Sequence, residues 1–134
     1  MSAQRTAARS LWPVWASGLA SAALFALIAS YLSPLSPDPI QLQLALTPRA
    51  FGELVHAWPP EHLARYRAHF PADFAMLVCY GAFGRWLCTR TALTRPLPIE
   101  WRAAARWLLP LAAACDAAEN WAHRWLTELP RFGM

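Results

Sequence analysis

The residues best suited to chemistry are two acids, an amide and an imidazole at helical spacing: Asp116, Glu119, Asn120 and His123. They lie in a stretch that is otherwise rich in Ala, Leu and Trp. In hydrocarbon an ionised carboxylate costs about 2.5–3.5 kcal/mol, so it persists where it is shielded, paired, protonated or used. The pattern therefore indicates a site in which Asp116 or Glu119 is the candidate acid or base and His123 its neighbour.

The elements that hold these residues are predicted to lie in a membrane. Of the 134 residues, 57% are hydrophobic and 15% are charged, and eight are Trp. This composition fits neither a disordered chain nor a typical soluble domain. The length limits the chain to one compact unit, so we expect residues 1–134 to form a single integral membrane domain.

The first predicted span covers about residues 11–32, which carry no charge. About 20 apolar residues cross a hydrocarbon core of about 30 Å. Trp12 and Trp15 stand at one end and Tyr31 at the other, where amphipathic rings suit the two interfaces. A cleaved signal peptide is the alternative, but its apolar region is usually only about 7–15 residues long.

Two more spans are predicted at about residues 70–88 and 101–127. Asp73 and Arg85 stand near the ends of the earlier one, and Pro110 interrupts the later one. Between the first two spans, a proline-rich loop is followed by short amphipathic helices at about 48–58 and 60–69, which we expect to lie along the membrane surface. The predicted fold class is thus an all-α membrane protein with three transmembrane helices and short interfacial helices.

The arginines predict the orientation of the chain. Two precede the first span, and five crowd the connection between the second and third: Arg85, Arg90, Arg95, Arg102 and Arg106. Because positive charge is retained in the cytoplasm, the amino terminus and this connection are expected on the cytoplasmic side of a bacterial inner membrane. This topology accounts for the net charge of +4, so no nucleic-acid partner is expected.

Counting residues along the second and third spans predicts two polar layers. Measured from the outer ends, Asp73 and His123 lie about 5 Å deep, whereas Tyr80 and Asp116 lie about 15 Å deep. We therefore expect Asp73 beside His123, and Tyr80 beside Asp116, Glu119 and Asn120. All six form the predicted polar cluster. Desolvation and a like-charged neighbour would keep at least one of its carboxyls protonated.

Two motifs resemble those of a group of small bacterial multi-pass membrane proteins of unknown function. Asp73 to Gly81 has the spacing D-x6-Y-G, and Leu109 to Asn120 has the spacing L-P-x5-D-x2-E-N. The resemblance implies a first span, an amphipathic stretch ending near Pro60-Glu61, and two spans that carry the motifs. A fourth span usually follows in that group and is absent here, which implies an open polar face on the third. The group implies no activity.

Each feature has a structural alternative. Asp116, Glu119 and Asn120 suit a hydrogen-bonded knot that locks helices together, Asp73 suits a helix cap, and Tyr80 suits a packed aromatic. One helix supplies too few ligands for a metal, and no span histidines match in depth for haem, so no metal or cofactor is expected. The cysteines form no C-x2-C pair and suit small buried hydrophobes: Cys79, Cys88 and Cys115.

The predicted function is an accessory or interaction protein of the inner membrane, with membrane lipid and a partner membrane protein or a second copy as its contacts. The alternative is a membrane-embedded enzyme or an ion- or proton-handling site that uses Asp116 or Glu119 with His123. A competing architecture has one anchor followed by an outside helical domain. It would place five arginines in a translocated segment, against the usual bias.

Overall fold

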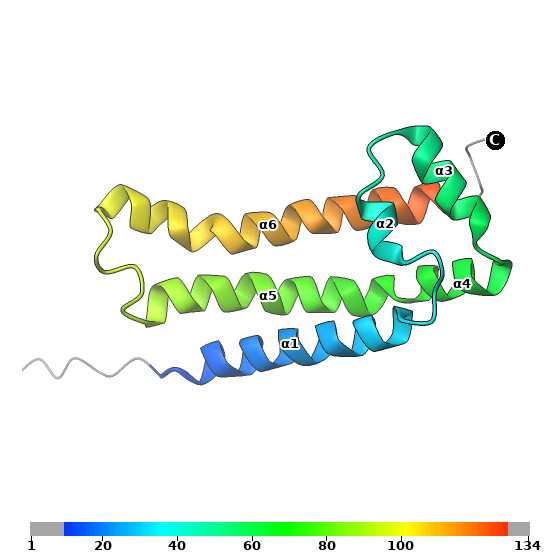
Figure 1. The fold of residues 1–134 in the computed structure, drawn as a ribbon. Helices are drawn as coiled ribbons and strands as arrows, with labels where there is room; N and C mark the ends of the chain where they lie inside the picture. Colours follow the sequence, from blue (N-terminus) through cyan, green and yellow to red (C-terminus); the bar gives the residue numbers. More distant parts are fainter. Residues whose placement is uncertain (1–9, 129–134) are drawn as a thin grey trace, which may run out of the picture.

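The computed structural model describes residues 10–128, and within that range α-helix is the only regular secondary structure. This confirms the all-α class. Three long helices form a flat bundle, and three short helices cover one end of it (Figure 1). The helices are α1 (Trp12–Leu32), α2 (Pro39–Gln43), α3 (Pro48–Ala57), α4 (Pro60–Ala68), α5 (Phe70–Arg90) and α6 (Ile99–Leu126).

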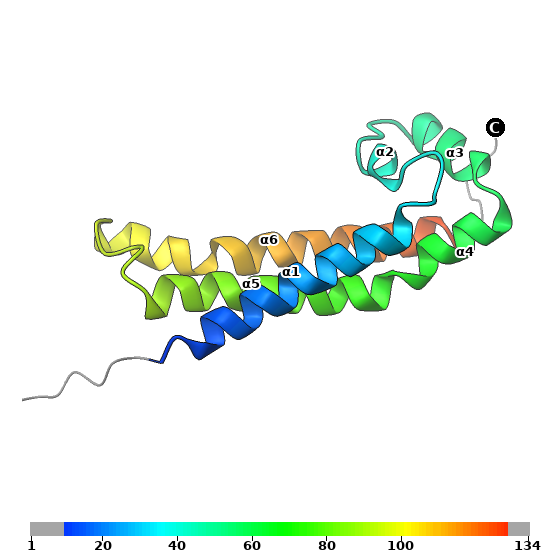
Figure 2. The same ribbon diagram turned by 60° about the horizontal axis from the view of Figure 1, so that its bottom comes forward.

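Helix α5 is the centre of the bundle. Both α1 and α6 pack on α5, and they have little contact with each other. Each runs antiparallel to α5, and α1 crosses it obliquely (Figure 2). The three long helices contain 21, 21 and 28 residues, which at 1.5 Å per residue gives lengths of about 31, 31 and 42 Å.

Small residues on α5 allow the close approach of α6. A Cβ atom built on Gly84 would lie 2.3 Å from Cβ of Leu109, so only glycine fits there without a shift of the neighbouring helix. One turn away, a Cβ on Gly81 would lie at an ordinary 3.4 Å from Cβ of Ala113. The tightest point of the α5–α6 interface is therefore at Gly84.

The short helices form a lobe with its own apolar core. Aliphatic and aromatic side chains from the loop before α2, from α2 to α4 and from the start of α5 bury one another: Leu35, Leu42, Phe51, Val55, Trp58, Tyr66 and Phe70. The indole nitrogen of Trp58 donates to the carbonyl oxygen of Pro37 at 2.8 Å. The lobe is thus packed as a unit against the end of the bundle where α1 ends and α5 begins.

Local sequence explains where α2 and α3 begin. The carboxylate of Asp38 accepts from the amide of Ile40 at 2.9 Å, and the hydroxyl of Thr47 accepts from the amide of Ala50 at 3.1 Å. In both helices a proline follows the capping residue, at a position whose amide would have no helical partner. Helix α3 begins at the residue where the sequence predicts a short helix, about residue 48, whereas α2 lies where a loop was expected.

By length and hydropathy, one helix in residues 10–128 could cross a membrane, namely α1. A core helix of a soluble protein and a signal sequence can meet the same criteria, although few residues of α1 are buried here. Helices α5 and α6 fall short of these criteria. Both contain charged residues within their length, so three spans stay a prediction.

Candidate functional site

The polar residues of α5 and α6 meet at the lobe end of the bundle. The amide nitrogen of Asn120 on α6 donates to a carboxylate oxygen of Asp73, which lies in the first turn of α5. Asn120 is buried and Asp73 half-buried. A buried amide that donates to a carboxylate satisfies both groups, so this contact fixes the register of the two helices.

A second contact joins the lobe to α6. The hydroxyl of Tyr66 on α4 lies 3.0 Å from Nδ1 of His123. On the other side of the imidazole, Nε2 lies 3.9 Å from Oε1 of Glu119, which is an ion-pair distance and too long for a hydrogen bond. Tyr66, His123 and Glu119 therefore stand in a row that leads from the core of the lobe to the surface of α6.

Burial shifts the pKa of two lobe residues, Tyr66 in this row and His69 beside it. Tyr66 is 3% exposed, and burial, with smaller contributions from the charges of Glu119 and Asp73, raises the pKa of its hydroxyl. His69 lies between α4 and α5, where burial lowers its pKa. Its Nδ1 faces the carbonyl oxygen of Tyr66 and must donate to it, so the neutral ring carries its proton on Nδ1.

The predicted layers are only partly assembled. Asp73 bonds Asn120 and His123 bonds Tyr66, so the expected Asp73–His123 pair is not formed. Tyr80 and Asp116 line the same cavity. Glu119 and Asn120 are not part of that cavity's lining.

Asp116 and Glu119 are exposed, which differs from the buried carboxyls that the sequence suggested. The reason is the spacing of the long helices. Because α1 and α6 have little contact, the face of α6 that carries these acids is open to the space between the two helices.

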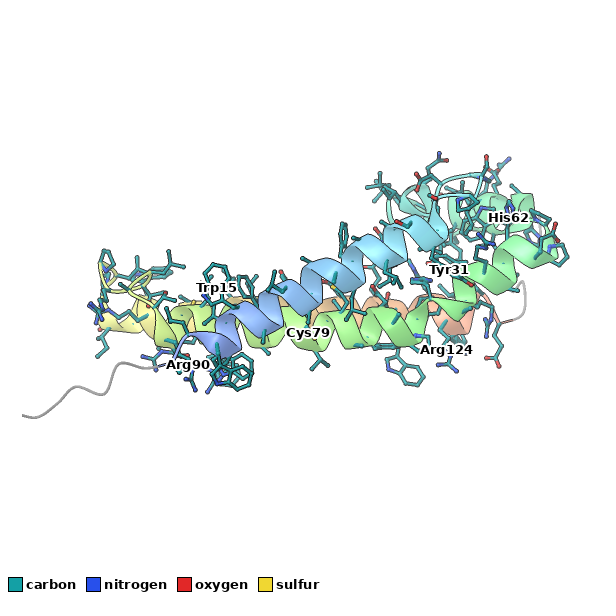
Figure 3. The ribbon with its side chains drawn as sticks, turned by 90° about the horizontal axis from the view of Figure 1, so that it is seen from below. Trp15, Tyr31, His62, Cys79, Arg90 and Arg124 are labelled. Atoms are coloured by element: carbon teal, nitrogen blue, oxygen red, sulfur yellow. The ribbon has the colours of Figure 1, made fainter. Side chains whose placement is uncertain are left out.

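That space is a groove with α5 as its floor. A cavity of about 640 Å³ lies beside the lobe, and a second of about 720 Å³ extends toward the start of α1. The two cavities share four lining residues: Phe25, Met76, Leu77 and Asp116. We treat them as one continuous feature and call it the α1–α6 groove. Figure 3 views the bundle from the α1 side, with Trp15 and Tyr31 labelled toward opposite ends of α1.

The two ends of the α1–α6 groove differ in polarity. The lobe end is lined by four carboxylates, by Tyr66, His69 and Asn120, and by apolar side chains of α1 and α2; the carboxylates are Asp38, Asp73, Asp116 and Glu119. The other end is lined almost wholly by aliphatic and aromatic side chains such as Leu19, Phe83 and Leu87. A cavity with convergent polar groups beside an apolar surface is a typical binding site for a small molecule.

The side chains that could bind a metal or act as a thiol nucleophile are not gathered into a site of this kind in the described part of the chain. Among residues 10–128, no three His, Cys, Asp or Glu side chains are grouped as metal ligands. The three cysteines of that range are free thiols: Cys79 and Cys88 are half-buried and Cys115 is exposed.

Tyr66 and His69 were not among the predicted site residues, because α4 was expected to lie along the membrane surface. Arg65 and Arg67 flank Tyr66 and obscure the pattern. A signal was nevertheless present, because Leu63, Tyr66 and Phe70 have the i, i+3, i+7 spacing of an apolar helix face. That stripe packs into the lobe core with the predicted apolar face of α3.

In comparisons with known proteins, no family model, curated protein or solved structure matches the chain. The resemblance carried by the D-x6-Y-G and L-P-x5-D-x2-E-N motifs therefore stays a prediction.

Proposed function

We propose that the chain is a three-span protein of the bacterial inner membrane with its amino terminus in the cytoplasm. Exposed aromatic side chains support this topology. On α6, Trp101 and Trp121 are both exposed and stand 20 residues apart, about 30 Å, which is the thickness of a hydrocarbon core. On α1, the exposed Trp12 and Tyr31 have nearly the same separation.

The charges support the same orientation. The arginines from Arg85 to Arg106 gather where α5 ends and α6 begins, close to the start of α1, and the guanidinium of Arg90 donates to the carbonyl oxygen of Ser10 at 3.0 Å. Figure 3 shows Arg90 and Arg124 toward opposite ends of the bundle. Among the described residues, the end where α5 meets α6 carries five arginines and the lobe end carries four, so the positive-inside rule makes the former the cytoplasmic end.

The topology is tested by a single cysteine in the loop between α5 and α6. Leu93 is 62% exposed, whereas its neighbour Thr94 is buried and donates to the carbonyl oxygen of Cys88. Leu93→Cys, in a background without the native cysteines, is expected to resist a membrane-impermeant thiol reagent in intact cells and to react after lysis. Reaction in intact cells would show that the chain has one anchor and that the loop lies outside.

Within the membrane, we propose that the protein acts as an accessory or interaction protein. The observation that supports this role is an exposed stripe on α6, spaced alternately by three and four residues: Trp101, Ala104, Leu108, Leu111, Cys115, Ala118, Ala122 and Trp125. This spacing forms a seam that winds slowly around the helix, and its small residues allow another helix to approach closely. We call this seam the outer stripe of α6.

A photoreactive amino acid at Leu111 tests the role of the outer stripe. In native membranes it is expected to crosslink to one membrane protein, or to a second copy, identified by mass spectrometry. Leu27 is the matched control because it is an exposed leucine on α1 that lines no cavity. Adding Ala118→Trp is expected to abolish the crosslink from Leu111. Crosslinks to lipid alone at both positions would contradict an interaction role.

One contact supports the alternative, an enzyme or proton-handling site. The row from Tyr66 through His123 to Glu119 joins a buried hydroxyl, an imidazole and an exposed carboxylate, which are the groups that move protons. In a strain whose deletion phenotype the gene complements, Glu119→Gln would then fail to complement at normal protein level. Full complementation would exclude Glu119 as an essential acid or base.

A further inference from the structure

The α1–α6 groove combines two surfaces that a single molecule can satisfy together. Its apolar part runs along α1 from Phe25 back to Leu11, which is 14 residues or about 21 Å of helix. Its polar part begins at Asp116, which lines both cavities, and ends under the lobe. The groove therefore matches an elongated amphipathic molecule with its head toward the lobe.

The charge of the polar part selects the head. Four carboxylates line it, and none of its lining residues is an arginine. Two of the four have side chains without a strong partner: Asp116 is exposed, and Glu119 is 48% exposed and 3.9 Å from His123. A cationic head is attracted by this lining, whereas a phosphate or carboxylate head is repelled.

An independent observation concerns His69, which is 8% exposed and contributes to the lining of the same cavity. Its Nδ1 is used by the carbonyl oxygen of Tyr66. None of the hydrogen bonds among the described residues uses its Nε2, which in this tautomer is an acceptor. An acceptor that faces no protein donor in a cavity lined by carboxylates suits a ligand that carries several N–H groups.

We propose that the α1–α6 groove binds a membrane-soluble primary amine with a long apolar chain. The ammonium group lies among Asp73, Asp116 and Glu119 and donates one hydrogen to Nε2 of His69. The chain lies along α5, against Leu77 and Phe83. A protonated amine supplies three donors and one positive charge, which is what the lining lacks. This inference does not depend on a protein partner at the outer stripe of α6.

Photolabelling tests the proposal with a dodecylamine that carries a diazirine in its chain. The full-length protein is placed in nanodiscs of phosphatidylcholine at neutral pH, and labelled residues are mapped by mass spectrometry. Labelling is expected to concentrate on groove residues such as Phe25 and Phe83 and to be displaced by unlabelled dodecylamine. The diazirine analogue of dodecanol is the control, since it has the same chain with an uncharged head.

Conservative variants test whether the carboxylate charge, and not the folding of the bundle, determines amine binding. Asp116→Asn and Glu119→Gln change exposed side chains, so the bundle is expected to remain folded. Each is expected to weaken displacement by dodecylamine about tenfold, the value of one charge-assisted hydrogen bond. Glu100→Gln is the matched control because Glu100 is exposed on α6 but lines neither cavity. It is expected to leave displacement unchanged.

Three results would overturn the proposal. Equal labelling of the groove by the alcohol would show that the amine is not recognised. Labels spread over the exposed faces of all three long helices would show simple partition into the bilayer. Unchanged displacement in both Asp116→Asn and Glu119→Gln, with the fold intact by circular dichroism, would show that the carboxylates do not hold the head.

Discussion

The hydroxyl of Tyr66 lies 3.0 Å from Nδ1 of His123, although the two residues are 57 positions apart. This contact ties the lobe to the end of α6. The guanidinium of Arg67 reinforces it by donating to the carbonyl oxygen of Arg124 at 2.9 Å and to the hydroxyl of Thr127 at 3.2 Å. The lobe is therefore fixed to the bundle by directional bonds as well as by apolar packing.

Tyr66→Phe removes the hydroxyl and leaves the ring in the lobe core. We expect the free energy of unfolding to fall by about 0.5–1.5 kcal/mol, the net value of one hydrogen bond. Thermal unfolding in detergent, followed by circular dichroism, measures it. Tyr31→Phe is the matched control, because Tyr31 is an exposed tyrosine whose contacts with Arg65 use its ring and its carbonyl oxygen. An equal loss in both variants would contradict a role for the Tyr66–His123 bond.

The buried His69 predicts a pH dependence of stability. Its ordinary pKa is 6.5 and burial lowers it in the folded state, against the smaller opposing effects of the Tyr66 carbonyl and Asp73. Below pH 6.5 the unfolded chain therefore takes up a proton that the folded chain does not, so the free energy of unfolding falls as the pH falls through this window. At higher pH, His69 makes no pH-dependent contribution because it is neutral in both states.

Unfolding midpoints measured from about pH 8 to about pH 5 check this dependence. His69→Asn is expected to flatten the decline below pH 6.5. A His69→Asn profile as steep as that of the native chain would assign the decline to other groups.

The glycines of α5 predict opposite effects at two neighbouring positions. Gly84→Ala places a Cβ 2.3 Å from Cβ of Leu109, and we expect a loss of about 1–3 kcal/mol because α6 must shift. At Gly81 the added Cβ meets Ala113 at 3.4 Å, so Gly81→Ala is expected to be neutral or to gain up to about 1 kcal/mol from helix propensity. Unfolding midpoints compare the two, and equal effects would place the closest α5–α6 contact elsewhere.

Substitutions at Asn120 and at Asp116 are expected to differ in their effect on stability. Asn120→Ala leaves the carboxylate of Asp73 without its amide donor in a half-buried position, and we expect a loss of about 1–3 kcal/mol. Asp116→Asn changes an exposed side chain and is expected to alter protein level and stability little. Protein level in membranes and unfolding midpoints measure both. A larger loss at Asp116 than at Asn120 would reverse the assignment of the structural bond.

Much of the helical framework was accessible from the sequence, because its signals are local. The uncharged run of α1, the Thr47–Pro48 start of α3 and the Pro59–Pro60 break each act within a few residues. Helix α2 was missed because Asp38 caps it after a run of prolines that favours a loop.

The contacts within the candidate site were harder to predict. Counting residues gives depth along a helix to within about one turn, but it does not say which of two adjacent turns meets a neighbour. Asn120 and His123 are three residues apart, and both lie within about one turn of the depth of Asp73. The choice depends on α4, which brings Tyr66 to His123 and leaves Asn120 for Asp73. That choice is made by the packing of the lobe, which no local pattern encodes.

The attachment of α1 has a mechanical consequence. Since α1 packs on α5 and has little contact with α6, its tilt alone can change the width of the groove while the α5–α6 pair stays closed. Gly18 sits against the ring of Phe83, where an added Cβ would lie 3.0 Å from the ring atoms, so α1 and α5 are in close contact there. Any widening of the groove would therefore be taken up by α1, because the α5–α6 pair is closed at Gly84.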